Sequence, residues 1–339
     1  MEAEINSIFT LFFEGNPIKA QIIDTSRGEG DFRTVLIIET DSMNRCVIKL
    51  AENDFTSPDR IAVWERTANE YRRLGCWCPR IFRDKTGGFP TIEYRGHNCV
   101  AYAEEFSPYR PAVDRAEAED NGGEALYESY KLDVWSITAR IAAQHFDYSP
   151  FPSAYCLFET FCPSDKTDEV LENALAWKEC ADKLPEEFSE QTDRIWQLWI
   201  ENRAALEKVY NKLPSSVFQA DLNPTNILLD DDGGFVGLYD FNLCGREVFL
   251  NYLMRENYEG FSREIAMIRD ALRISSAYYR FSEIEKETAT MLYRCLKPLW
   301  YSRVENLKEL GNDREAIAAF LDETEYYLTS EIDFTDCMG

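Results

Sequence analysis

Hydrophobic and polar positions in the first hundred residues follow the alternation and the β-branched composition that are typical of β-strands. The apolar segments are short, and turn-forming residues separate them. Five strands are expected, over residues 21–24, 33–40, 46–51, 91–94 and 99–106. The first three follow one another closely enough along the chain to predict an antiparallel meander.

One helix is predicted among these strands. Its pattern spans residues 59–74, and Ser57 and Pro58 stand where a helix cap and a first-turn proline belong. Together the strands and the helix make a small lobe that ends near residue 106. The next segment, residues 107–125, is polar and acidic and contains two prolines and two glycines, which is typical of a connector between domains.

Helical periodicity dominates the remainder of the chain, because apolar residues recur there at intervals of three and four. Five such stretches cover residues 131–146, 194–213, 262–281, 283–310 and 314–328. One β-rich island, residues 226–241, interrupts them, and its DDDGG turn predicts a hairpin. We therefore expect an α+β chain with an antiparallel sheet lobe over residues 1–106 and a mainly helical lobe over residues 107–339.

The charge balance excludes two classes of partner. The 339 residues carry a formal net charge of −25, whereas a nucleic-acid backbone or an anionic membrane surface requires a basic footprint. Residues 1–107 hold 17 acidic and 13 basic side chains, and residues 108–339 hold 44 and 23, for net charges of −4 and −21. The negative charge is therefore concentrated in the second lobe.

Cysteine use and the N-terminal segment favour a cytoplasmic protein. The ten cysteines are scattered, and Cys76 and Cys78 have one intervening residue rather than the two of a redox or zinc motif. Because the chain has only two histidines, His97 and His145, we expect thiols packed as small apolar groups instead of a zinc site. No stretch approaches the roughly 18 apolar residues of a membrane span, and the first twenty residues lack the basic start of a signal peptide.

Three polar residues stand out in residues 216–242, within and beside the β-rich island: Asp221, Asn226 five positions later, and Asp240 after the second hairpin strand. Each alone is more often a turn residue than a ligand. Phosphoryl transfer requires a carboxylate that orients the attacking hydroxyl and oxygen ligands that hold a metal ion. The three residues provide that set at the spacing of a kinase catalytic loop and metal motif.

The segment QADLNPTNILLDDDGGFVGLYDFN, residues 219–242, resembles the catalytic loop and metal motif of the aminoglycoside phosphotransferase and choline kinase superfamily. Gln219 and Ala220 stand where that family usually has His and Gly, and Asn242 departs from its usual ending. The resemblance implies a two-lobed protein-kinase-like fold with ATP in the cleft between the lobes. It also implies that Asp221 positions the acceptor hydroxyl and that Asn226 and Asp240 hold Mg²⁺.

A weaker resemblance covers roughly residues 20–260. It implies that Lys49, in CVIKLA, holds the α- and β-phosphates of the nucleotide and that a helix glutamate steadies it. Glu70 and Glu65 both lie on the predicted helix, five residues apart. We favour Glu70 because NEYRRL followed by CPRIF resembles the helix and following strand of the family, and Glu65 remains an alternative.

The same resemblance extends to two backbone features and one histidine. Gly28 and Gly30, in SRGEGDF, would form the loop over the nucleotide phosphates, although most such loops are ordinary hairpin turns. The hinge that binds adenine through backbone groups is expected at Glu104, Glu105 and Phe106. His145 corresponds to a family position that we interpret as a packed structural histidine. These residues carry less functional signal than the catalytic segment.

We therefore expect an ATP- and Mg²⁺-dependent kinase that phosphorylates a hydroxyl on a small, cationic molecule. A protein kinase is disfavoured because no Ala-Pro-Glu-like segment follows Asp240 and a helical pattern begins at about Glu247. A catalytically weak nucleotide-binding pseudokinase remains open, because Gln219 and Asn242 depart from the family motif. A purely structural protein would leave the spacing of Asp221, Asn226 and Asp240 unexplained.

Overall fold

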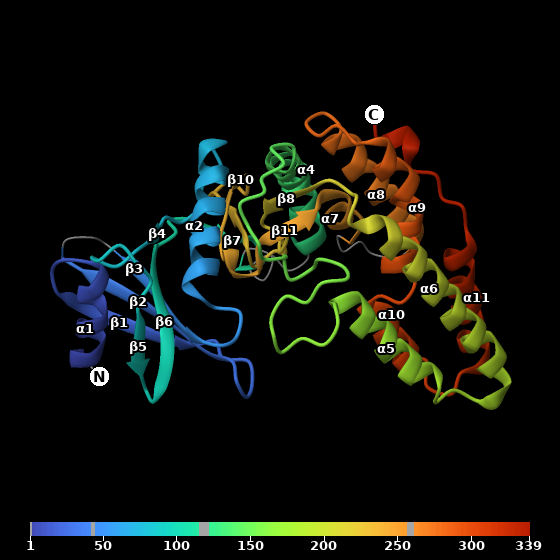
Figure 1. Cartoon of the computed structure of the whole chain (residues 1–339), viewed down its shortest axis with the longest axis horizontal. Coiled ribbons are helices and arrows are strands. Elements are labelled where there is room, and N and C mark those ends of the chain that lie inside the picture. The colour runs from blue at the N-terminus through green and yellow to red at the C-terminus, as the bar shows by residue number, and fades with distance from the viewer. Residues whose placement is uncertain (1, 42–44, 115–121, 256–260) are drawn as a thin grey trace.

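The computed structural model describes residues 2–41, 45–114, 122–255 and 261–339. Two lobes are arranged along the long axis of the molecule, a strand-rich lobe at the N-terminus and a larger helical lobe after it (Figure 1). This division confirms the α+β, two-lobed fold expected from the sequence. Among the described residues, no helix is both long and apolar enough to cross a membrane.

The first lobe contains a six-stranded antiparallel sheet in the order β1-β2-β3-β6-β4, with β5 paired to β6. Its strands are β1 (Pro17–Asp24), β2 (Phe32–Thr40), β3 (Cys46–Glu52), β4 (Ile81–Phe82), β5 (Thr91–Tyr94) and β6 (His97–Glu105). The five predicted strands and the meander β1-β2-β3 are confirmed. β4 was not predicted, because two residues carry no periodic signal.

Two helices accompany this sheet, one of which the sequence did not predict. Helix α1 (Glu2–Phe12) places Phe9 in a core with Leu36 and Ile48 of the sheet. Helix α2 (Pro58–Arg73) was predicted, and its cap is present because the Ser57 hydroxyl accepts a hydrogen bond from the Arg60 N–H at 3.3 Å. On β6, Ala101 and Ala103 join the core of α1, whereas the intervening Tyr102 joins the core of α2. The two helices therefore cover opposite faces of the sheet.

The second lobe is mainly helical, as predicted. Its α-helices are α4 (Gly122–Ala142), α5 (Glu169–Ala181), α6 (Ser189–Tyr210), α7 (Phe249–Arg255), α8 (Phe261–Ser275), α9 (Glu283–Leu296), α10 (Tyr301–Glu309) and α11 (Arg314–Thr329). Its short strands are β7 (Arg110–Pro111), β8 (Ser215–Phe218), β9 (Ile227–Leu229), β10 (Phe235–Leu238) and β11 (Gly245–Val248). They form a three-stranded sheet, β10-β9-β7, and a pair, β11-β8. The predicted hairpin of the island is therefore β9-β10.

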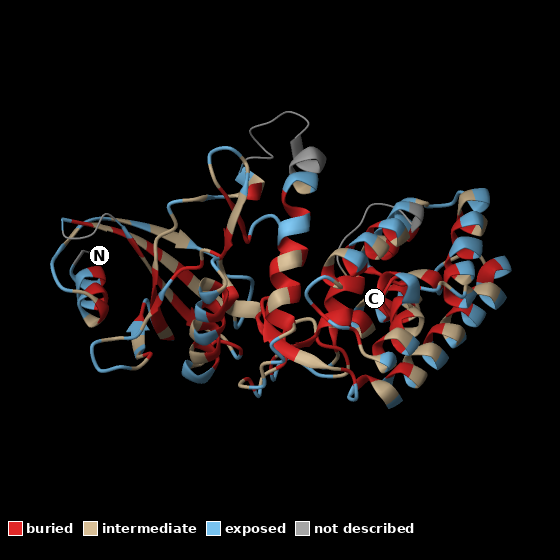
Figure 2. Ribbon diagram, turned by 90° about the horizontal axis from the view of Figure 1, so that it is seen from above, coloured by how far each residue is buried: buried red, intermediate tan, exposed pale blue. Residues whose placement is uncertain are grey.

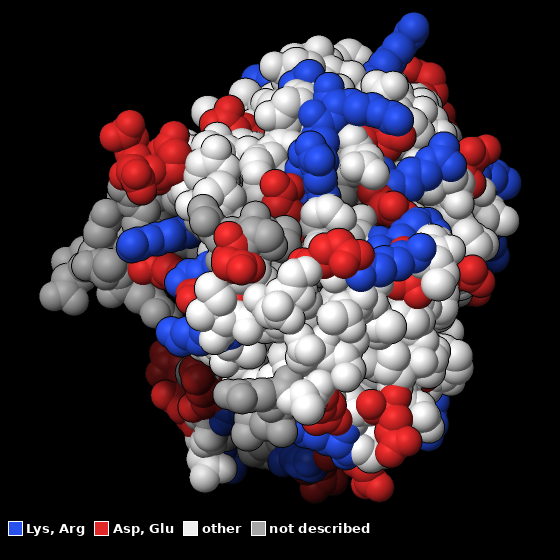
Figure 3. Space-filling model, turned by 90° about the vertical axis from the view of Figure 1, so that its left-hand side faces the viewer, with Lys and Arg blue, Asp and Glu red and all other residues white. Residues whose placement is uncertain are grey.

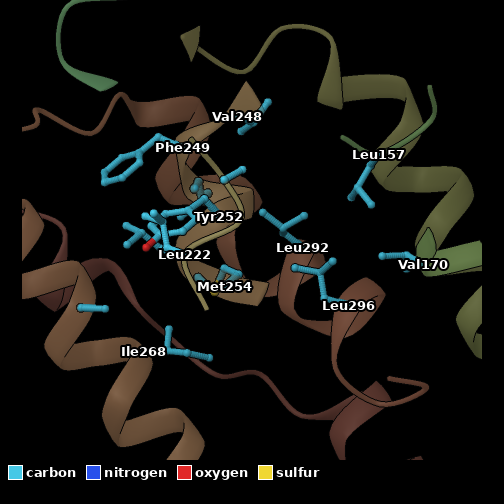
Figure 4. Close-up of a cluster of buried hydrophobic side chains, with 14 of the residues drawn as sticks. Leu157, Val170, Leu222, Val248, Phe249, Tyr252, Met254, Ile268, Leu292 and Leu296 are labelled. Carbon is cyan, nitrogen blue, oxygen red and sulfur yellow. The ribbon is translucent and has the colours of Figure 1, made fainter. Parts of the chain in front are cut away.

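Buried residues run through the second lobe and into the junction with the first (Figure 2). Figure 4 shows part of this core, in which Phe249 and Tyr252 of α7 lie near Leu222 of the loop after β8 and Leu292 of α9. The strands and loops that pack against this continuous apolar core are held by many contacts rather than by any single one.

The helical predictions failed at two positions. The pattern at 283–310 predicts one helix, but the chain breaks into α9 and α10 around Pro298, where proline removes a backbone donor. Helix α5 was not predicted, whereas α7 begins at Phe249, close to the helical pattern expected from about Glu247. Part of the connector at 107–125, residues 115–121, lies outside the described residues.

The expectation of a packed His145 was wrong. This residue follows α4 in a left-handed conformation with φ 48°, and its side chain is exposed apart from a ring contact with Tyr279 at 5.6 Å. The cysteines agree with the expectation of packed thiols, because all ten are free and nine of them are buried.

The two lobes are joined at a backbone bridge between Trp77 and Gly237. The Trp77 N–H donates to the Val236 carbonyl, and the Leu238 N–H donates to the Trp77 carbonyl, both at 2.9 Å. A Cβ atom at Gly237 would lie 2.1 Å from the Trp77 carbonyl oxygen. Only glycine allows the two backbones to approach so closely, so Gly237 is a requirement of the lobe junction.

We expect Gly237→Ala to destabilise the protein by roughly 1–3 kcal/mol or more, because strand β10 would have to separate from Trp77. Gly88→Ala is the matched control, since its Cβ would meet nothing closer than 3.8 Å. Thermal unfolding followed by circular dichroism would measure both variants. Equal midpoints for Gly237→Ala and the wild type would show that the junction tolerates a side chain.

Candidate active site

The catalytic segment predicted from the sequence forms a compact unit within the second lobe. Strand β8 leads into a loop that carries Asp221 and Asn226, and the hairpin β9-β10 follows. Asp240 lies just after β10, at the start of a short 3-10 helix over Phe241–Leu243. Because the loop and the end of the hairpin belong to one unit, residues distant in sequence are held close together.

The side chain of Asn226 is hydrogen-bonded directly to Asp221. The Asn226 side-chain N–H group donates to the backbone carbonyl of Asp221 and to its Oδ2, both at 2.9 Å. Asn223 donates to the other carboxylate oxygen, Oδ1, at 2.7 Å. The Asp221 carboxylate is therefore oriented from both sides while it remains half-buried. This arrangement fixes the orientation of the Asp221 carboxylate and turns the amide oxygen of Asn226 away from it.

Lys49 of the first lobe reaches Asp240 of the second. The Lys49 ammonium lies 3.0 Å from Asp240 Oδ1 and 3.1 Å from Glu104 Oε2. Burial lowers the pKa of Lys49, but the negative charges of Asp240 and Glu104 outweigh that effect and hold the pKa well above its usual value. The lysine is therefore a permanent cation that bridges the two lobes.

Gln219 occupies the position of the family histidine and connects the two halves of the motif. Its side-chain N–H donates to the Asp240 carbonyl at 2.5 Å, and its side-chain oxygen accepts from the Asp221 N–H at 3.2 Å. The side chain is fully buried. Helix α2 also touches this residue, because the Tyr71 hydroxyl accepts from the Gln219 backbone N–H at 3.3 Å. A glutamine thus supplies a buried link between Asp221 and Asp240 without a titratable group.

Neither glutamate expected from helix α2 lies beside Lys49. Glu70 pairs with Arg73 at 2.6 Å, and Glu65 pairs with Arg83 at 2.7 Å. The carboxylate that meets Lys49 from within the first lobe belongs to Glu104 of β6. The expected pairing with Glu70 therefore does not occur in this structure, because each helix glutamate is paired with an arginine.

Gly28 and Gly30 lie in the loop between β1 and β2, as expected. Both have positive φ values, 94° and 80°, and no atom lies within 4 Å of a Cβ built at either position. The loop therefore requires glycine for its backbone conformation rather than for close packing. Both glycines are exposed, and the Arg27 N–H of the same loop donates to the Asp31 carbonyl at 3.1 Å.

The expected hinge lies at the end of β6. The Glu105 N–H donates to the Arg80 carbonyl at 2.9 Å, and the Glu105 side chain pairs with Arg72 at 3.3 Å. This donor is therefore not available to a nucleobase. Phe106 follows the strand, where its ring lies under the Arg45 guanidinium at 5.1 Å. The backbone of Phe106 is the remaining candidate for contact with a base.

Sequence reasoning missed Tyr155, whose side chain lies beside Asp221. Its hydroxyl is hydrogen-bonded to Asp221, and burial together with the nearby carboxylate raises the pKa of that hydroxyl. The Arg255 guanidinium lies 3.6 Å from the centre of the Tyr155 ring and pairs with Glu169 at 2.5 Å. Tyr155 belongs to an irregular loop between α4 and α5, so no periodic pattern singled it out.

The oxygen atoms around the motif fit a hard divalent cation. Asn226 directs its amide nitrogen at Asp221. Its amide oxygen accepts from the Thr225 hydroxyl at 3.3 Å and has a second lone pair for a ligand, and Asp240 offers a carboxylate that is 34% exposed. Among the described residues, no group of three or more His, Cys, Asp or Glu side chains could hold a metal ion. Such a sparse donor set suits Mg²⁺, which is usually held by one or two carboxylates and by substrate phosphates.

Comparison with known proteins agrees with this geometry. Residues 104–249, which include the whole catalytic segment, match the model of the Phosphotransferase enzyme family. No curated protein sequence shows significant similarity to the chain.

Two solved structures share the fold. An amicoumacin kinase in complex with AMP-PNP, Ca²⁺ and amicoumacin is 15% identical with a TM-score of 0.57, and the match covers 99% of this chain and 96% of that one. An aminoglycoside phosphotransferase from Alicyclobacillus acidocaldarius is 12% identical with a TM-score of 0.51, and the match covers 95% of each chain. These structures confirm the protein-kinase-like fold. With the family match, they support the resemblance to the aminoglycoside phosphotransferase and choline kinase superfamily.

We expect Gln219→Glu to disturb the motif severely, because an ionised carboxylate would face the Asp240 carbonyl oxygen in a fully buried position. Loss of the donor should lower the free energy of unfolding by about 1–3 kcal/mol or more at neutral pH. Lower pH should restore part of the lost stability, since protonation of the introduced carboxylate returns a hydrogen-bond donor. Gln21→Glu, at an exposed strand position, controls for the added charge. The measurement is urea unfolding at two pH values. Equal free energies of unfolding for Gln219→Glu and the wild type at neutral pH would contradict this account.

Proposed function

We infer that the chain is a phosphotransferase, and we propose that it uses ATP and Mg²⁺ to phosphorylate a hydroxyl group on a small, cationic molecule. The observation that carries this proposal is the approach of Lys49 and Asp240 to 3.0 Å across the two lobes, beside the bonded pair Asp221 and Asn226. A lysine from the first lobe thus meets, at one place, the three polar residues that the catalytic segment of the second lobe carries. The family match over residues 104–249 supports the same reaction class.

Each residue has a distinct task in this proposal. Asp221 accepts a hydrogen bond from the acceptor hydroxyl and orients its oxygen for in-line attack. Lys49 places a fixed positive charge against the α- and β-phosphates. Asn226 and Asp240 would hold Mg²⁺, which would supply positive charge beside the phosphate oxygens. The protein contributes position and electrostatics, which is what phosphoryl transfer chiefly requires.

The cationic acceptor is the finer part of the proposal. The second lobe carries a net charge of −21, against −4 in the first. Figure 3 shows the end of the molecule formed by the first lobe, where basic and acidic side chains lie side by side. In the superfamily that the chain resembles, the second lobe binds the acceptor. An excess of acidic side chains there would attract an amine.

The direct test of catalysis is Asp221→Asn, which keeps the shape of the side chain and removes its charge. We expect turnover to fall about 10²-fold or more while ATP affinity changes little. Asp232→Asn, in the exposed hairpin turn, is the matched control. The measurement is ATP-dependent phosphate transfer to a panel of amino sugars, amino alcohols and neutral alcohols. Full activity in Asp221→Asn would refute the assignment, and wild-type nucleotide binding without transfer to any acceptor would favour the pseudokinase alternative.

The charge of the acceptor is tested by ionic strength. For the best acceptor in the panel, kcat/KM should fall as salt rises past about 0.1 M, where the screening length is ~10 Å. The matched comparison is a neutral alcohol of similar size, whose kcat/KM should not respond. A preference for a neutral or anionic acceptor, or a kcat/KM that ignores salt, would leave the acidic lobe as a solvated surface.

A further inference from the structure

The partner of Lys49 in the first lobe is fixed by strand register. In the β3-β6 pair, Lys49 lies opposite Tyr102 and Val47 lies opposite Glu104. Glu104 is therefore two residues along β6 from the position facing Lys49, and side chains two residues apart share one face of a sheet. Diagonal neighbours on one face are within reach when both side chains are long. The resulting contact between Lys49 Nζ and Glu104 Oε2 is 3.1 Å.

This pair is largely removed from solvent. The Glu104 side chain is 7% exposed and the Lys49 side chain 17%. Burial raises the pKa of Glu104, and the positive charge of Lys49 opposes that rise. A carboxylate in such surroundings stays charged only if a cation accompanies it. The two side chains therefore hold each other in one orientation.

Helix α2 offers Lys49 no carboxylate of its own. Glu70 and Glu65 are held by Arg73 and Arg83, both of which belong to the first lobe. Asp240, the other partner of Lys49, comes from the second lobe and is a metal-ligand candidate. If Asp240 turns toward a cation, Glu104 is the partner that remains to hold Lys49.

We propose that Glu104 of strand β6, and not a glutamate of helix α2, is the positioning residue that orients Lys49 toward the nucleotide phosphates. The inference rests on the proposed function and deepens it. Since β3 and β6 are neighbours in one sheet, the orientation of Lys49 does not depend on where α2 lies. Movement of α2 would leave the lysine in place.

The test is nucleotide affinity in the full-length protein, measured calorimetrically with AMP-PNP and Mg²⁺. Glu104→Gln keeps the size of the side chain and removes its charge. If Glu104 positions Lys49, affinity should fall at least about ten-fold, because the ammonium loses its charged anchor. If Glu104 is only a nearby negative charge, its removal should leave phosphate binding equal or tighter. The two alternatives are therefore distinguished by whether AMP-PNP affinity falls in Glu104→Gln.

Glu70→Gln is the matched control, since it makes the same chemical change on α2, and it should bind AMP-PNP within about two-fold of the wild type. The inference would be overturned if Glu104→Gln bound AMP-PNP as tightly as the wild type. A ten-fold loss of AMP-PNP affinity in Glu70→Gln would overturn it as well. Should Glu104→Gln fail to fold, the second variant is Glu104→Asp, which keeps the charge but withdraws it from Lys49. A several-fold weaker affinity of Glu104→Asp for AMP-PNP would support the inference, and an unchanged affinity would refute it. Failure of the wild type to bind AMP-PNP would refute the proposed function instead.

Discussion

The candidate site depends on one ion pair, in which Lys49 of the first lobe lies 3.0 Å from Asp240 of the second, 191 residues away in sequence. A largely buried ammonium is costly without opposite charge, so the pair constrains how the lobes can meet. The lobe junction lies next to it, because the bridge between Trp77 and Gly237 holds strand β10 three residues before Asp240. Backbone pairing thus sets the position that the ion pair requires.

Buried polar contacts surround this pair. Gln219 joins Asp240 to Asp221 through its two amide atoms, and the Tyr71 ring of α2 meets Phe241 at 5.8 Å. Helix α2 therefore supports the motif from the first lobe by packing, although it gives no carboxylate to Lys49. Gln219, at the position where the family usually has histidine, donates to the Asp240 carbonyl.

The sequence predicted those features that are local. Asp221, Asn226 and Asp240 share one short segment with a recognisable hairpin, and Lys49 follows a clear strand pattern, so the structure brings together residues that spacing had already singled out. The role of Glu104 could not be predicted, because it depends on the register of β3 against β6 and on the arginines that pair with the helix glutamates. Helix α1 was missed because its short apolar pattern gains meaning only from the sheet face that it covers. Tyr155 was missed because irregular loops have no period.

The central claim is that Lys49 and Asp240 form a nucleotide and Mg²⁺ site, and the metal dependence of nucleotide affinity tests it most directly. Calorimetric titration of AMP-PNP at increasing Mg²⁺ should show affinity rising in the wild type. Asp240→Ala should lose that rise, and Asn226→Ala should lose less of it because a neutral ligand is removed. The same Mg²⁺ dependence in Asp240→Ala and the wild type would contradict the account and leave Asp240 as a turn residue.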